Sequence, residues 1–284
     1  AAGCCAASSV DHALILMDGD IPLPAFFFYL TTVLLGLCLG SFATALAWRL
    51  PRGVPLAQKA RSGCPSCGHD LGARDLVPLF SWMMLGGRCR YCRTPVGLRY
   101  PLIELSTLAL CLVFHVVFGF SAVTLCAFAL APALVAMVDI DFRHKILPDV
   151  LNITVAVAGV AAIFAASLES FDGPDFLVRQ LGEAGAAALL YGGGSWGLRF
   201  LFLKLMGREA LGLGDVKFFA AAGVWLGLSP DSLAAFLLLS GGLGVVIALL
   251  WRKISGQAEF PFGPALIAAF VAVLLWRGLY FIVI

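Results

Sequence analysis

Long apolar runs separated by short polar stretches dominate the pattern of hydrophobic and polar positions. We identify eight runs, near residues 25–47, 102–118, 121–140, 150–168, 184–203, 215–229, 231–250 and 261–283. Most of them approach the roughly 20 residues that an α-helix needs to cross about 30 Å of hydrocarbon. The sixth run is short, so we expect a helix there that is tilted, broken or sheltered by its neighbours. The pattern predicts an all-α polytopic membrane protein with about eight transmembrane helices.

The composition excludes an ordinary soluble domain. Of the 284 residues, 61% are hydrophobic and 13% are charged, and the mean hydropathy is +0.97. Soluble domains carry roughly 25% charged residues, about twice this share. The net charge of +2 gives no sign of a nucleic-acid partner. The lipid bilayer is therefore the first partner that the sequence predicts.

The distribution of basic residues orients the predicted helices. If the long polar stretch at 48–101 is cytoplasmic, alternation puts the loops at 141–149, 204–214 and 251–260 on the same side. Of the 19 Lys and Arg residues, only Arg179 and Arg277 then fall on the other side. This bias follows the positive-inside rule, so we expect both termini to be extracytoplasmic.

These boundaries divide the chain into four parts. They are an extracytoplasmic N-terminal segment at 1–24, a first transmembrane helix at 25–48, a cytoplasmic loop module at 49–101 and a membrane-embedded domain at 102–284. The loop module is rich in Gly, Pro, Arg and Cys and has few periodic apolar residues. Such a segment buries too little surface to offset its ordering entropy, so we expect it to need a covalent or metal staple.

Four cysteines in the loop module have the spacing of a metal site. Cys64, Cys67, Cys89 and Cys92 form the pattern C-x2-C-x21-C-x2-C. Two close pairs about twenty residues apart can bring four thiolates into the tetrahedron that structural zinc prefers. Two disulfides are the first alternative, which the reducing cytosol disfavours. A redox-active CxxC is the second, disfavoured because no strand–helix pattern surrounds it. We predict one structural zinc.

Two aspartates stand at the ends of predicted membrane helices. Asp141 lies just before a basic turn that ends in Pro148, and Asp215 follows Gly212 and Gly214. A carboxylate near hydrocarbon is costly, roughly 2.5–3.5 kcal/mol at a helix centre, so its default interpretation is functional. Both aspartates emerge on the predicted cytoplasmic side.

These aspartates have the properties of an acid–base pair. Close together, they would share one proton, so that one carboxylate activates water while the other protonates the leaving group. Asp139 is about 200° around the helix from Asp141, which leaves it a packing or hydrogen-bonding role. Asp149 is expected to be the N-cap of the fourth helix. The alternative is that Asp141 and Asp215 are only N-caps.

Six motifs in order resemble those of the bacterial type IV prepilin leader peptidases. They are Gly40-Ser41-Phe42 with Trp48-Arg49-Leu50-Pro51, the four-cysteine loop, Arg99 to Leu105, Ile140-Asp141 to Asp149, Gly212 to Lys217, and Phe260-Pro261-Phe262-Gly263-Pro264. The likeness runs from about Gly40 to Pro264. By this resemblance the chain is identified as a member of the family of GxGD aspartic endopeptidases that also act as N-methyltransferases.

The resemblance implies specific roles. Asp141 and Asp215 would be the catalytic pair, with Gly212, Gly214 and Lys217 in the loop that supports it. Type IV prepilins or type II secretion pseudopilins would lose a short basic leader at the cytoplasmic face of the bacterial inner membrane.

The resemblance also implies a second activity. The new N-terminal residue would then be methylated, with S-adenosylmethionine as the donor. The resemblance places this methyl transfer on the cysteine loop and the nearby cytosolic surface, with Gly87, Arg88 and Glu104 as the candidate residues for it.

Two functions from other classes compete with this interpretation. A transporter could use the same aspartates to relay protons or bind cations, which predicts inverted repeats and carboxylates near the middle of the membrane. The sequence shows neither feature. A zinc-ribbon scaffold could instead bind a secretion machine, and its aspartates would tolerate replacement by asparagine.

Overall fold

The computed structural model describes residues 23–55, 62–170, 173–207, 211–257 and 259–283. Most of the predicted N-terminal segment at 1–24 therefore lies outside the described residues. These ranges contain eight long helices: α2 (Leu23–Arg49), α4 (Arg99–Phe118), α5 (Ala122–His144), α6 (Asp149–Glu169), α7 (Gly173–Met206), α8 (Leu213–Leu226), α9 (Pro230–Ser255) and α10 (Gly263–Val283). Three short helices, η1 (Leu50–Arg52), η2 (Ala73–Asp75) and α3 (Phe80–Met84), lie between α2 and α4.

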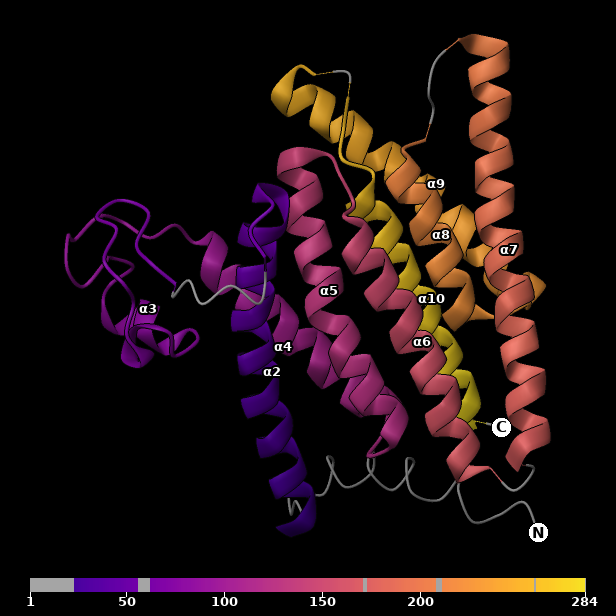
Figure 1. The fold of residues 1–284 in the computed structure, drawn as a ribbon, viewed down its shortest axis with the longest axis horizontal. Helices are drawn as coiled ribbons and strands as arrows, with labels where there is room; N and C mark the ends of the chain where they lie inside the picture. Colours follow the sequence, from indigo (N-terminus) through magenta and orange to yellow (C-terminus); the bar gives the residue numbers. More distant parts are fainter. Residues whose placement is uncertain (1–22, 56–61, 171–172, 208–210, 258, 284) are drawn as a thin grey trace.

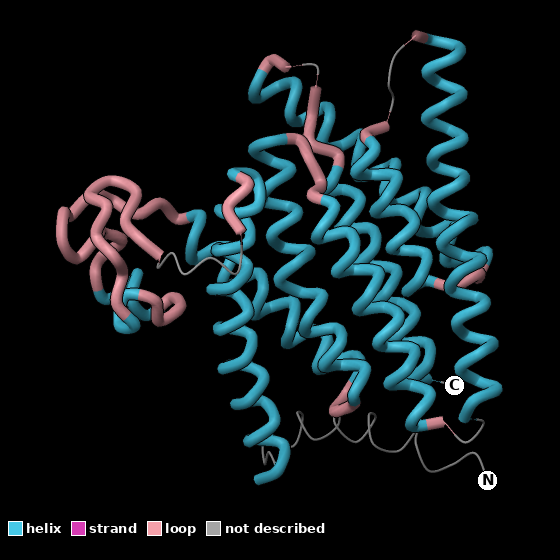
Figure 2. The backbone as a smooth tube through the Cα atoms, viewed as in Figure 1, coloured by secondary structure: helices cyan, strands magenta, loops and turns pink. Residues whose placement is uncertain are grey.

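The prediction of an all-α fold is confirmed for the described residues, which contain no strand (Figure 2). Each of the eight apolar runs corresponds to one long helix. Five of these helices, α2, α4, α5, α6 and α9, are long and apolar enough to cross a membrane. A shorter apolar stretch, Gly263–Gly278, lies in α10. The predicted count of eight spans stays a prediction.

Helix α7 is longer than its apolar run. It begins at Gly173, about ten residues before the predicted start at 184, and carries Asp175 in its first turn. An acidic side chain there interacts favourably with the positive end of the helix dipole. The hydropathy pattern predicts which part of a helix contacts hydrocarbon. It does not predict how far the helix continues beyond the apolar residues, so it missed the first turns of α7.

The helices form one bundle with the loop module at its side (Figure 1). The last turns of α5, α7 and α9 and the first turns of α6, α8 and α10 lie toward the same end of the bundle, uppermost in Figure 1. The loop module lies beyond α2 and α4, on the side away from α7. Helix α5 has the largest buried share among the candidate spans, so it forms the centre of the core.

Helix α8, the shortest of the eight, is sheltered by its neighbours, as expected for the sixth run. Phe218, Phe219 and Ala222 are buried between α8 and the helices around it. Glycines allow the close approach of α7. A Cβ atom at Gly223 would lie 2.8 Å from the carbonyl oxygen of Ala187, and one at Gly192 would lie 2.7 Å from the Cβ of Ala220. Small residues at such crossings let helix backbones pack closely.

We expect Gly192→Ala to lower the stability of the bundle, while Gly193→Ala leaves it unchanged or raises it. Both positions are in α7, and alanine is the better helix former at either one. Only the methyl group at residue 192 meets a neighbour, because nothing lies within 4 Å of a Cβ at Gly193. Overpacking typically costs about 1–3 kcal/mol. The midpoints of thermal unfolding in detergent compare the two variants, and equal midpoints would contradict the packing described here.

Candidate active site and metal centre

Asp141 is a buried carboxylate in the last turn of α5, with 4% of its surface exposed. The helix ends at His144, and the next residue, Lys145, adopts the left-handed conformation (φ 54°) and turns the chain toward α6. The backbone N–H of Gly263, at the start of α10, donates to Asp141 Oδ2 at 2.7 Å. This position is not a helix start, so the alternative that Asp141 is an N-cap is wrong.

Gly263 has to be a glycine for this contact to form. A Cβ atom there would lie 2.8 Å from Asp141 Oδ2 and 3.0 Å from Leu147 Cδ2. Real Cβ atoms essentially never approach so closely, so a side chain would displace the carboxylate or the start of α10. No role for Gly263 was predicted from the sequence, although the motif around it was one of the six that carried the resemblance.

Asp215 lies in the first turn of α8 and is half-buried. Its Oδ2 accepts the backbone N–H of Gly212 at 3.1 Å, a capping contact. Gly212 is the N-cap of α8, so the alternative that Asp215 is itself an N-cap is wrong, although its carboxylate binds the N-cap backbone from three residues later.

Leu147 connects the surroundings of the two aspartates. A Cβ at Gly214 would lie 3.0 Å from both the Cβ and the carbonyl oxygen of Leu147, whose Cδ2 also faces Gly263. The α5–α6 turn is thus packed between the starts of α8 and α10. The structure brings both predicted carboxylates to one end of the bundle, and the two glycines let the backbone approach them.

Helix α6 holds the start of α8 in place. Lys217 Nζ contacts both carboxylate oxygens of Asp149 at 2.7 Å, and Asn152 Nδ2 donates to the carbonyl oxygen of Gly214 at 3.3 Å. The expectation that Asp149 is an N-cap is wrong. Pro148 occupies the cap, and Asp149 is the first helical residue. The Asp149 carboxylate binds the Lys217 ammonium of α8 instead, and no local sequence pattern reveals a contact between two helices.

Asp139 faces away from Asp141 and binds a different helix. Arg99 Nε donates to Asp139 Oδ1 at 2.7 Å, and Arg99 Nη2 contacts Oδ2. Arg143, one turn later in α5, lies 3.6 Å from Oδ1. Paired contacts between a guanidinium and a carboxylate fix geometry well. The ion pair joins the start of α4 to α5, which agrees with the supporting role expected for Asp139.

The four cysteines of the loop module gather into one cluster. The Sγ atoms of Cys64, Cys67, Cys89 and Cys92 all lie within 4.8 Å of one another. Those of Cys64 and Cys92 are 3.8 Å apart. A disulfide needs about 2.05 Å, whereas four sulfurs around zinc, each at about 2.3 Å, are about 3.8 Å apart. The cluster fits a tetrahedral metal ion.

Two similar turns supply the sulfurs. The bridge between Gly63 and Asp70 closes the first turn, and the bridge between Arg88 and Pro95 closes the second. In each, the residue four positions after the first cysteine has a positive φ, 70° at Gly68 and 59° at Arg93. A non-glycine residue there costs roughly 1–2 kcal/mol.

The three residues expected to take part in methyl transfer lie around one cavity. Arg88 and Glu104 line it. Gly87 lies behind its wall, with a positive φ of 66°, and a Cβ there would lie 2.9 Å from Trp82 Cζ2. Gly87 therefore supports an aromatic wall residue.

A bundle of apolar helices with an aspartate pair at one end and a four-cysteine cluster on a loop defines a polytopic membrane protein with a candidate aspartic peptidase site. The chain belongs to the type IV leader peptidase family, whose model matches residues 128–249. The bacterial peptidase A24 N-terminal domain matches residues 34–118. The resemblance drawn from the motifs is confirmed.

Three relatives illustrate the match. The prepilin leader peptidase/N-methyltransferase of Burkholderia pseudomallei is 34% identical and covers 89% of this chain and 86% of its own length. That of Pseudomonas aeruginosa is 34% identical, with 88% and 90% covered. The type 4 prepilin-like proteins leader peptide-processing enzyme of Escherichia coli is 33% identical, with 86% and 93% covered. No solved structure matches the chain.

We expect the purified protein to contain about one zinc ion per chain, and Cys64→Ser combined with Cys67→Ser to lose it. Two of four thiolates cannot complete the tetrahedron. Elemental analysis of protein purified without chelator measures the metal. Cys38→Ser is the control, because Cys38 is exposed and outside the cluster. Two disulfides in a metal-free native protein would contradict this prediction.

We expect Gly263→Ala to reduce cleavage by the site about 10–100-fold while the protein stays folded, because the new methyl group displaces the Asp141 carboxylate. Cleavage of a leader-bearing pilin peptide measures the effect. Gly242→Ala in α9 is the matched control, since nothing lies within 4 Å of a Cβ there. Wild-type rates in both variants would show that the Asp141–Gly263 contact plays no part in the reaction.

Proposed function

We propose that this protein is a membrane-embedded prepilin leader peptidase that also N-methylates the processed product. The observation that carries the peptidase half is the placement of Asp141 in the last turn of α5 and Asp215 in the first turn of α8, with Leu147 packed against the glycine beside each of them. The relatives, which are named for both activities and aligned over most of the chain, support the proposal.

The two carboxylates suit general acid–base hydrolysis of a peptide bond. Each accepts one backbone N–H at the start of a helix, Asp141 from Gly263 and Asp215 from Gly212. Because like charges at short range cannot both stay ionised, the pair holds one proton between them. The ionised carboxylate deprotonates a water that attacks the scissile carbonyl. The protonated one then gives its proton to the leaving nitrogen.

The substrate would be a type IV prepilin or a type II secretion pseudopilin. Such a chain places a short basic leader in the cytosol and an apolar helix in the membrane, so its cleavage site lies at the membrane surface. We place the aspartate pair at the cytoplasmic face of the bacterial inner membrane and both termini outside. The bias of basic residues supports this orientation.

We assign a structural zinc to the four cysteines. Four thiolates leave no open position for substrate, so the metal would hold the loop module together rather than take part in the reaction. Zinc binding in comparable peptides contributes on the order of 10–16 kcal/mol, enough to order a segment with little core. S-adenosylmethionine would supply the methyl group for the second reaction.

We expect Asp141→Asn and Asp215→Asn each to reduce leader removal at least about 100-fold, because an amide can neither accept the proton from water nor share one with its partner. Cleavage of a purified prepilin, followed by mass spectrometry, measures the loss. Asp231→Asn, in the first turn of α9, is the control. Full processing by either active-site variant would refute the catalytic pair.

The same variants discriminate between the competing functions. A transporter predicts ion flux into proteoliposomes that the asparagine variants abolish, without any cleavage of the prepilin. A zinc-ribbon scaffold predicts that both variants behave like the wild type. If the asparagine variants lose cleavage and the wild-type protein carries no ion flux, the result supports the peptidase and neither of the other two functions.

A further inference from the structure

The loop module carries an apolar face that no part of the described chain covers. Among the described residues 62–98, seven large apolar side chains are exposed, and five of them lie between Leu76 and Met84. Three of these five are on the short helix α3, where Phe80 is 60% exposed, Met83 71% and Met84 70%. Their spacing of three and four residues puts them on one side of the helix, and we call these three side chains the α3 face.

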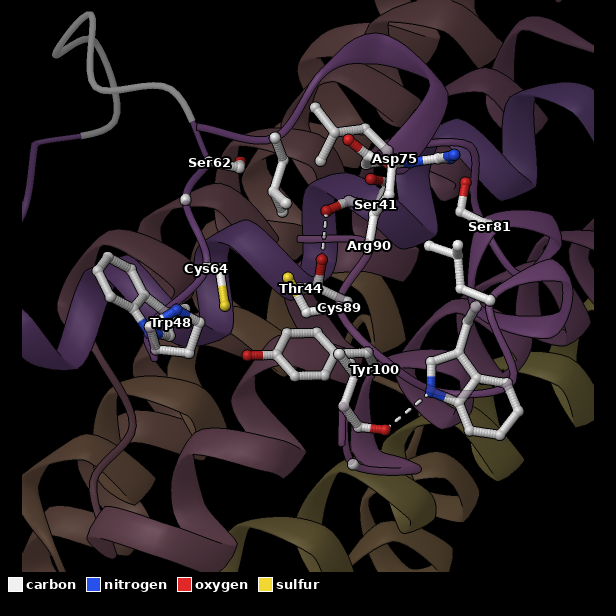
Figure 3. Close-up of a pocket in the computed structure, with 18 of the residues that line it drawn as sticks. Ser41, Thr44, Trp48, Ser62, Cys64, Asp75, Ser81, Cys89, Arg90 and Tyr100 are labelled. Carbon is white, nitrogen blue, oxygen red and sulfur yellow. Dashed lines mark hydrogen bonds and ion pairs between the residues drawn. The ribbon is translucent and has the colours of Figure 1, made fainter. Parts of the chain in front are cut away.

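The opposite side of α3 packs inward. Ser81 is buried, and its Oγ donates to the carbonyl oxygen of Arg74 at 2.6 Å. Trp82 Nε1 donates to the carbonyl oxygen of Val96 at 2.9 Å. Ser81 and Trp82 also line the cavity between the loop module and helices α2 and α4 (Figure 3). These contacts fix α3 with its apolar side outward, the reverse of the orientation that a helix has on a water-soluble domain.

The packing of α2 against α4 determines how deep α3 lies. A Cβ at Gly40 would lie 2.8 Å from the Cα of Glu104, and one at Gly36 would lie 3.3 Å from the Cα of Leu108. The two helices are therefore antiparallel, with Gly40 beside Glu104. The Glu104 carboxylate accepts the backbone N–H of Leu79, the residue before α3, at 2.8 Å. The start of α3 is thus close to the level of Gly40 and Glu104.

This level is inside the apolar segments of both helices. Gly40 is seven residues before the end of the apolar run at 25–47, and Glu104 is two residues after the start of the run at 102–118. At about 1.5 Å per residue, these positions are about 10 Å and about 3 Å deep. Helices that lie in a membrane interface are buried about 5–10 Å into it. In Figure 1, α3 lies beside α2 and α4, lower in the view than the end of α2.

The surroundings of α3 have the apolar surface and the charge that a membrane interface attracts. Helix α4 is apolar enough to span a membrane, and in its first turns Leu102 and Leu105 are 59% and 47% exposed. Nine Lys and Arg but only two Asp lie between residues 49 and 101. Arg74 and Arg88, both exposed, flank the apolar segment of α3 in the sequence. Basic residues beside exposed apolar ones are typical of a segment that lies on an anionic membrane surface.

We infer that the α3 face inserts into the interface of the bilayer and contacts lipid acyl chains. The loop module is then held against the membrane by α3 as well as by α2 and α4. The four-cysteine cluster lies beside the membrane surface and does not move freely in solution. The inference does not depend on the proposed peptidase or methyltransferase activity, because it rests on exposure, helix packing and charge.

A photoreactive phospholipid tests this contact. The full-length protein is placed in nanodiscs of phosphatidylethanolamine and phosphatidylglycerol that contain a phospholipid with a diazirine in its acyl chain. After illumination, mass spectrometry maps the labelled residues. We expect labels on residues 80–84 and 102–105, and at least about fivefold less label on residues 88–95 of the second cysteine turn, because only the first two segments reach the acyl chains.

A single charge on the α3 face provides the second measurement. Met83→Asp should reduce the labelling of residues 80–84 at least about fivefold and leave that of 102–105 unchanged, because a carboxylate is costly in hydrocarbon. Ala73→Asp, at an exposed position of η2 in the same module, is the matched control and should change neither. Equal midpoints of thermal unfolding show that both variants are folded.

Three results would overturn the inference. The first is a wild-type protein that is labelled on α4 and not on residues 80–84. The second is equal labelling of these residues in the wild type and in Met83→Asp. The third is a face that lipid does not reach and that chemical crosslinks join instead to a prepilin or to a second copy of this chain.

Discussion

The burial of the Asp141 carboxylate against the first backbone N–H of α10 is the constraint on which the rest of this end of the bundle depends. A carboxylate that is only 4% exposed needs a hydrogen-bond donor, and the Gly263 amide at 2.7 Å supplies one. That distance is possible only without a side chain at residue 263. Leu147 then packs against Gly263 and Gly214, which brings the start of α8, and with it Asp215, to the same place.

Ion pairs and hydrogen bonds between helix ends keep this arrangement in register. Arg99 and Asp139 join α4 to α5, and Lys217 and Asp149 join α8 to α6. Arg99 is also the first residue of α4, at the C-terminal end of the loop module. The segment that the four cysteines organise therefore connects to the helix that carries Asp141 through one partly buried ion pair. The aspartate pair and the four-cysteine cluster are separate sites, but this ion pair links the segments that carry them.

Several local features could be predicted from the sequence because their physical causes are local. Apolar runs of nearly membrane length identified all eight long helices, and the 200° between Asp139 and Asp141 correctly assigned them different neighbours. The cysteine spacing predicted a four-sulfur cluster, and the structure contains it. The two errors had non-local causes. Asp149 is bound by a lysine from α8 instead of capping its helix, and α7 continues through a polar segment that hydropathy could not assign.

By itself, the sequence determined which segments are helices, which four sulfurs meet and which two carboxylates stand at helix ends, since periodicity, spacing and charge act over short stretches of chain. Only the tertiary structure decided that Gly263 contacts Asp141. It also decided that Glu104 of α4 accepts the backbone N–H of Leu79 in the loop module. Both features depend on atoms more than twenty residues apart being brought within a few ångströms, and packing between helices sets those distances.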